Sequence, residues 1–63
     1  MIAVTRLNGK RFVVNAEMIR FIESTPDTII TLISGDRIMV KESLEQVVDL
    51  AIQYCRQIRA FNV

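Results

Sequence analysis

Residues 5–14 read TRLNGKRFVV and place an Asn-Gly pair between two runs of strand-forming residues. A two-residue loop at the Asn-Gly pair would set two arginines opposite each other and would separate Val4 from Phe12. A three-residue loop with a left-handed Gly9 instead pairs Val4 with Phe12 and gathers the apolar side chains of both strands on one face. The stretch therefore predicts a β-hairpin closed by a bulged three-residue loop.

The same pattern recurs at residues 31–40, which read TLISGDRIMV. The order of an apolar residue, a small polar residue, glycine, a charge, arginine and three apolar residues matches LNGKRFVV position by position. Convergence on one turn type and an ancient duplication both account for this repeat. In either case the pattern predicts a second bulged hairpin in which Ile30 faces Ile38.

Around these hairpins the pattern predicts an α+β fold, a small antiparallel five-stranded sheet followed by one C-terminal helix packed on it. The sheet is a meander or two similar hairpins, because the breaks between strands are short. The helix begins where the apolar period changes and where Ser43 and Gln46 form a capping-box pattern. The expected strands cover about residues 2–6, 10–15, 18–24, 28–33 and 37–41, and the expected helix covers about residues 43–60.

The small size of the chain predicts a single domain, residues 1–63, that needs additional stabilisation beyond its own core. One cysteine and no histidine exclude an internal disulfide and an ordinary zinc site, which leaves oligomerisation. No apolar run is long enough to span a bilayer and no signal-peptide pattern is present, so we expect a cytoplasmic protein. The net charge of +1 provides no overall attraction to nucleic acid or to anionic membranes.

Strand alternation divides the apolar residues between two faces of the sheet. The inner face, which the helix covers, is expected to hold Ile2, Val4, Phe12, Val14, Ile19, Phe21, Ile30, Leu32, Ile38 and Val40. The outer face mixes cations with apolar side chains, and we interpret it as a candidate partner-binding face, although solvated cations on a sheet are also common. Its members are Arg11, Arg20, Arg37, Lys41, Ile22, Ile29, Ile33 and Met39.

The apolar residues of the helix span an arc of roughly 200°, which is wider than one sheet covers. Leu50, Tyr54 and Phe61 lie at one margin of this arc and are candidate contacts in a homo-oligomer. The alternative is that they fold over the edge of the sheet. Cys55 also falls within the arc and is expected to be a small core residue.

The sequence offers no recognisable catalytic chemistry. It has no histidine to activate a nucleophile, its carboxylates are scattered, and both of its glycines belong to predicted turns. We therefore expect a non-enzymatic protein with no catalytic, cofactor-binding or metal-binding residues and no cofactor.

Residues 1–48 resemble the small flagellar FlbD/SwrD family, and the resemblance depends on VTRLNGK, VNAEMI, IESTPDT and VKES in combination. It implies a role in flagellar motility, including support of motor power during swarming. It further implies contact with a basal-body or stator component at the cytoplasmic face of the flagellar basal body. The protein would then lie close to the membrane through its partner, without a span of its own.

Residues 19–50 are also similar in pattern to LytTR-type DNA-binding domains, which implies an alternative function as a nucleic-acid-binding or regulatory module. Those domains contact DNA through extra loops and basic residues that this nearly neutral chain lacks. The sequence therefore favours the flagellar role over binding of nucleic acid.

Overall fold

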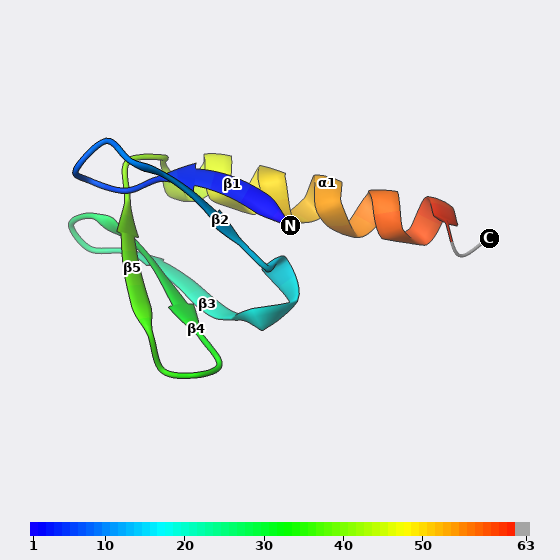
Figure 1. Ribbon diagram of the computed structural model, residues 1–63, viewed down its shortest axis with the longest axis horizontal. Coiled ribbons are helices and arrows are strands. Elements are labelled where there is room, and N and C mark those ends of the chain that lie inside the picture. Colours follow the sequence, from blue (N-terminus) through cyan, green and yellow to red (C-terminus); the bar gives the residue numbers. More distant parts are fainter. Residues whose placement is uncertain (62–63) are drawn as a thin grey trace.

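The computed structural model describes residues 1–61, and for residues 58–61 it describes the backbone alone. The elements in chain order are strand β1 (Ile2–Thr5), strand β2 (Arg11–Val14), a short 3-10 helix η1 (Ala16–Met18), strands β3 (Ile19–Ser24), β4 (Thr28–Leu32) and β5 (Arg37–Val40), and helix α1 (Leu44–Phe61). Figure 1 shows the strands grouped at one end of α1. All strand pairs are antiparallel, so the predicted α+β architecture of five strands and a C-terminal helix is confirmed.

The first hairpin has the bulged register that the sequence predicts. Val4 lies opposite Phe12, and the backbone N–H of Arg6 donates to the carbonyl of Lys10 at 2.8 Å. Gly9 closes the loop with a φ of 89°, a conformation that glycine adopts without a Cβ clash. The turn residues therefore set which side chains of β1 and β2 share a face.

The second hairpin repeats the first in hydrogen bonding as well as in sequence. Ile30 lies opposite Ile38, as predicted. The backbone N–H of Leu32 donates to the carbonyl of Asp36 at 2.8 Å, and that of Gly35 donates to the carbonyl of Leu32 at 2.9 Å. The first loop has the same two bonds, because its Gly9 N–H also donates to the Arg6 carbonyl at 2.8 Å. Both hairpins therefore use the same turn.

The strands form two sheets, β1-β2 and β3-β4-β5, that meet at one corner. At this corner Arg6 forms an isolated antiparallel bridge with Val40. The backbone N–H of Lys41 donates to the Thr5 carbonyl at 2.8 Å, and the Thr5 N–H donates to Glu42 Oε1 at 2.8 Å. The single sheet expected from the sequence is therefore divided, and Thr5 contributes two of the hydrogen bonds that join the two parts.

The core lies between the two sheets and the first turns of α1. Its buried members are Ile2, Val4, Val14, Ile30, Ile38, Val40 and Val47, and the partly buried residues around them include Phe12, Ala16, Ile19, Ile22, Leu32, Leu50 and Tyr54. Helix α1 contacts β1 and β3, and Figure 1 shows its second half extending beyond the strands. Only the first part of the helix therefore has the sheets to pack against.

Strand β3 departs from simple alternation. The pairing of β3 with β4 shifts between Ile19 and Phe21, so that two residues of β3 occupy the space of one. As a result Ile22 packs against the core, whereas the Phe21 side chain is 47% exposed on the other side of the sheet. The expectation that Phe21 faces inward and Ile22 outward is thus reversed.

Helix α1 begins with the predicted capping box. The Ser43 N–H donates to Gln46 Oε1 at 2.8 Å, and the Gln46 N–H donates to Ser43 Oγ at 3.2 Å. This reciprocal pair satisfies two backbone donors that a helix start otherwise leaves open. In the part of the chain that the structure describes, no helix is both long enough and apolar enough to cross a membrane.

The Glu42 carboxylate that holds Thr5 has a shifted pKa. Partial burial by itself raises this pKa, but hydrogen bonds from Thr5 and from the backbone of Glu42, together with the charge of Arg11, outweigh it. The net effect is a pKa below the usual value for glutamate. A lowered folded-state pKa means that the carboxylate stabilises the fold at neutral pH and loses this effect as the pH falls through that pKa.

We expect Glu42→Gln to lower the free energy of unfolding by about 1 kcal/mol at pH 7, since the bond is charge-assisted but partly exposed to solvent. Urea unfolding at pH 7 and at about pH 3, below the ordinary glutamate pKa, measures the effect. The difference between the wild type and the variant should shrink at the lower pH. A difference of equal size at both pH values would contradict the assigned role of the carboxylate.

Candidate functional site

The side of the β3-β4-β5 sheet that faces away from the core forms the candidate site, which we call the outer sheet face. It consists of two cross-strand rows, Phe21–Thr31–Arg37 and Glu23–Ile29–Met39. Residues directly opposite in antiparallel strands have side chains in contact distance. The face therefore presents apolar and charged side chains from three strands as one continuous surface.

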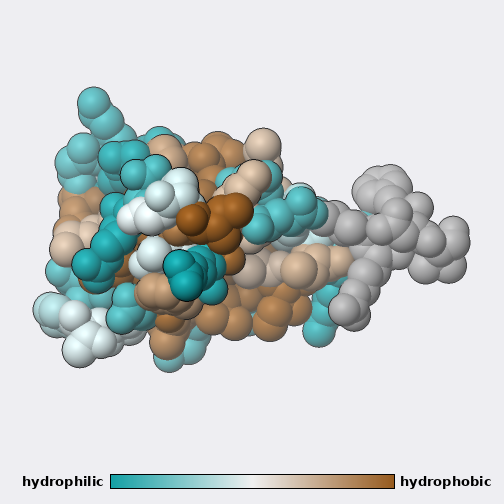
Figure 2. Space-filling model, turned by 90° about the horizontal axis from the view of Figure 1, so that it is seen from below, coloured by the Kyte–Doolittle hydropathy of each residue, from teal (hydrophilic) through white to brown (hydrophobic). Residues whose placement is uncertain are grey.

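The middle strand contributes buried side chains to this face, and the strands on either side contribute exposed ones. Ile29 and Thr31 are buried, while Phe21 and Met39 on the flanking strands are 47% and 49% exposed. Ile33, directly after β4, is also exposed, and its N–H donates to the Met18 carbonyl at 2.8 Å. Figure 2 shows apolar side chains reaching the surface between polar ones on the side of the molecule seen there.

Thr31 carries a further unusual feature of the outer sheet face. Its hydroxyl oxygen is buried and has no hydrogen-bond partner among the described residues. A buried hydroxyl without a partner costs roughly 1–3 kcal/mol. Thr31 therefore occupies the centre of this face at some expense to the stability of the isolated chain.

The charges of the outer sheet face compensate each other. Arg37 Nη2 lies 3.8 Å from Glu23 Oε1, and both side chains are substantially exposed. An exposed pair at this distance contributes little to stability, so both groups are free to exchange partners at low cost. The face is thus apolar and locally neutral, without the excess of positive charge that its arginines suggested.

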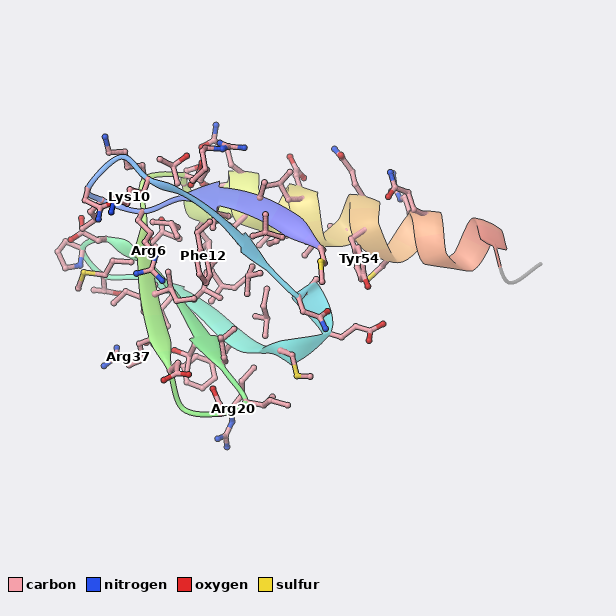
Figure 3. The ribbon with its side chains drawn as sticks, viewed as in Figure 1. Arg6, Lys10, Phe12, Arg20, Arg37 and Tyr54 are labelled. Carbon is pink, nitrogen blue, oxygen red and sulfur yellow. The ribbon has the colours of Figure 1, made fainter. Side chains whose placement is uncertain are left out.

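The other cations of the predicted face have separate surroundings. Arg11 lies on β2, in the other sheet, where its Nη1 donates to Thr5 Oγ1 at 3.1 Å. Figure 3 shows the side chains of Arg20 and Arg37 pointing in different directions. Lys41 is exposed beyond the end of β5. The structure does not gather these four cations into one patch.

Of the predicted partner-binding residues, the structure brings Ile29, Arg37 and Met39 together on the outer sheet face and leaves Ile33 exposed beside it. Ile22 lies on the opposite side, against the core. Sequence reasoning missed Phe21, Glu23 and Thr31 as members of the face. The placement of Phe21 and Glu23 depends on the bulge in β3, which no glycine or proline marks within that strand. Thr31 follows instead from the regular pairing of β4 with β5, and it was missed because the predicted face was built from apolar and cationic residues only.

Arg6 contacts an aromatic ring of the first hairpin and is not part of the outer sheet face. The Arg6 guanidinium lies over the Phe12 ring, 4.4 Å from its centroid, as Figure 3 shows for the two side chains. At an exposed position such a cation–π contact contributes about 0.5–1 kcal/mol. We interpret it as a structural contact that helps to fix the hairpin.

The helix residues also differ from the sequence expectation in part. Leu50 and Tyr54 are partly buried against the core, the arrangement that was the alternative to an oligomer contact. The Phe61 side chain lies outside the described residues. Cys55 is exposed instead of buried, because it lies on a side of α1 that the sheets do not cover.

The side chains that could ligate a metal are dispersed over the described part of the chain. Within residues 1–61, no group of three or more histidine, cysteine, aspartate or glutamate side chains is arranged to hold a metal ion. The outer sheet face likewise has one carboxylate, Glu23, and its neighbour Arg37 holds that carboxylate in an ion pair. The rest of the outer sheet face is made up of the apolar side chains of Phe21, Ile29 and Met39 and the hydroxyl of Thr31.

Comparison with known proteins gives one match. The family model of flagellar and swarming motility proteins, FlbD, matches residues 1–59. Searches of curated proteins and of solved structures returned no match. Since the match covers nearly the whole length, it includes both hairpins and most of α1. The chain therefore belongs to the FlbD family of flagellar and swarming motility proteins.

Proposed function

We propose that this protein is a non-enzymatic accessory factor of flagellar motility that acts through protein–protein contacts. It supports motor function or swarming by binding a basal-body or stator component at the cytoplasmic face of the flagellum, and it acts as a homo-oligomer. Membership of the FlbD family supports the connection with motility. The observation that carries the proposed mode of action is the outer sheet face with its exposed Phe21 and Met39.

The composition of this face suits a protein partner. Aromatic residues, methionine and arginine are enriched at protein interfaces, and the face provides one of each in Phe21, Met39 and Arg37. A partner that covered Phe21 and Met39 would remove apolar surface from water. A polar group from that partner could also reach the Thr31 hydroxyl or replace one member of the Glu23–Arg37 pair.

A deletion strain complemented with variants tests the proposal. Met39→Glu puts a charge on the outer sheet face, and we expect it to abolish swarming while the protein accumulates at the wild-type level. Val13→Glu is the matched control, because Val13 is an exposed apolar strand residue in the other sheet. This variant should swarm normally. Since both positions are exposed, both variants should keep the free energy of unfolding within about 1 kcal/mol of the wild type.

Equal swarming by the two complemented strains would exclude the outer sheet face as the binding surface. Filament staining of the deletion strain separates a role in assembly from a role in power, since a finished filament that fails to drive swarming indicates the motor. A gel shift at about 50 mM salt, where phosphate contacts are strong, tests the nucleic-acid alternative. We expect no retention of DNA or RNA.

A further inference from the structure

Helix α1 carries a second apolar stripe that the core does not use. Val48 and Ile52 are 39% and 43% exposed, and Cys55 is exposed as well. Their spacing of four and then three residues is the spacing of a coiled-coil seam. The three residues therefore form a continuous apolar line on the outside of the helix, which we call the helix stripe.

The helix stripe is well separated from the side of α1 that contacts the core. At 100° per residue, it lies roughly 130° around the helix from the side that carries Val47, Leu50 and Tyr54. The latter three residues pack in or against the core, which fixes the orientation of the helix. The second half of α1 also extends beyond the strands (Figure 1), so neither sheet limits access to the helix stripe there.

Three charged residues line one flank of the helix stripe, with the acidic residues nearer the start of the helix and the basic residue nearer its end. Glu45 and Asp49 lie toward the start of α1, and Arg56 lies toward its end. All three lie roughly 60–100° from Val48 around the helix, on the side away from the core. The flank is thus acidic at one end and basic at the other.

We propose that two copies of the chain pair through the helix stripe with their α1 helices antiparallel. In an antiparallel pair related by a two-fold axis, the charged flank of one helix faces the same flank of the other helix. The two flanks run in opposite directions, so the acidic end of each meets the basic end of the other. Asp49 of one copy then approaches Arg56 of the second copy, twice in the dimer. In a parallel pair this flank would instead meet the core-facing side of the other helix, where no charge complements it.

The helix stripe and its charged flank are self-complementary, so the partner that fits them is a second copy of the chain. The apolar line and the charge order both match themselves after a two-fold rotation, and a helix pair of this kind packs at 8–10 Å between axes. This inference deepens the homo-oligomer part of the proposed function. It assigns the dimer contact to Val48, Ile52 and Cys55 and leaves the outer sheet face available for a different partner.

Sedimentation equilibrium of the full chain under reducing conditions, which prevent cross-linking through Cys55, tests the pairing. We expect the wild type to dimerise below about 100 µM and Ile52→Glu to weaken the dimer at least about 30-fold, as for a central interface residue. Gln57→Glu is the matched control, because Gln57 is exposed and lies roughly 170° around the helix from the helix stripe. This variant should dimerise like the wild type. A monomeric wild type, or equal dimerisation of the two variants, would overturn the proposal.

Charge reversal tests the antiparallel orientation. Asp49→Arg and Arg56→Asp should each weaken the dimer about 5- to 10-fold, because each sets like charges together, and the double variant should recover most of the loss. Losses that merely add in the double variant would rule out the antiparallel pair. These measurements use purified protein only, so dimerisation can fail while the proposed motility role stands, and the Met39→Glu strain can swarm while the dimer stands.

Discussion

Replacing Ile30 with alanine should lower the free energy of unfolding by about 2–5 kcal/mol. Ile30 is 0% exposed at the middle of β4, the central strand of its sheet, and it packs in the core opposite Ile38. Alanine leaves a cavity that flanking strands on both sides prevent from closing. A chain of 63 residues has only about 3–9 kcal/mol of stability in total, so much of the variant should be unfolded at room temperature.

Circular dichroism during urea unfolding measures this effect, and two variants calibrate it. Ile30→Val removes a single methylene and should cost about 0.5–1.5 kcal/mol. Ile33→Ala truncates an exposed isoleucine three residues away and should change the stability by less than about 0.5 kcal/mol. Equal stabilities of Ile30→Ala and Ile33→Ala would contradict the position of the core between the sheets and α1.

The parts of the fold that the sequence predicts well are those that depend on local turn chemistry. Gly9 and Gly35 each require a left-handed turn, and that turn fixes the register of the strands on either side. The capping box at Ser43 likewise depends only on residues three positions apart. Information of this kind is contained in a few neighbouring residues, so a single sequence reveals it.

The features that the sequence did not reveal depend on contacts between distant residues. The division into two sheets follows from the corner at Thr5, whose partners Lys41 and Glu42 lie more than thirty residues away. Cys55 is exposed because the sheets cover only part of the length and part of the circumference of α1. An apolar arc on a helix predicts that its side chains are buried, but it does not show which part of the arc the chain itself covers.

In the candidate site, too, some positions were predicted correctly from the sequence and others were not. Arg37 and Met39 were predicted correctly as neighbours on the outer sheet face, because the second hairpin sets their strand in a regular register. Phe21 was assigned to the core, because alternation along β3 was counted through the bulge near Ile19. One extra residue in a strand reverses every later side chain. A bulge without a glycine leaves no local signal of this reversal.

The reversal in β3 leads to a direct test with neighbouring residues. Ile22→Ala should lower the free energy of unfolding by about 1–3 kcal/mol, since the Ile22 side chain packs against the core. Phe21→Ala should cost less than about 1 kcal/mol, although it removes the larger side chain, because the ring is nearly half exposed. Urea unfolding of both variants under the same conditions compares the two costs.

Uninterrupted alternation in β3 requires the opposite order, in which loss of the phenylalanine is the more damaging change. The measured order therefore decides between a bulged and a regular strand. Phe21→Ala also removes apolar surface from the outer sheet face, so we expect it to reduce swarming in the complemented strain even though the protein stays folded. If Phe21→Ala lowers the free energy of unfolding only slightly and the strain still swarms normally, the bulge has a structural role and no role in partner binding.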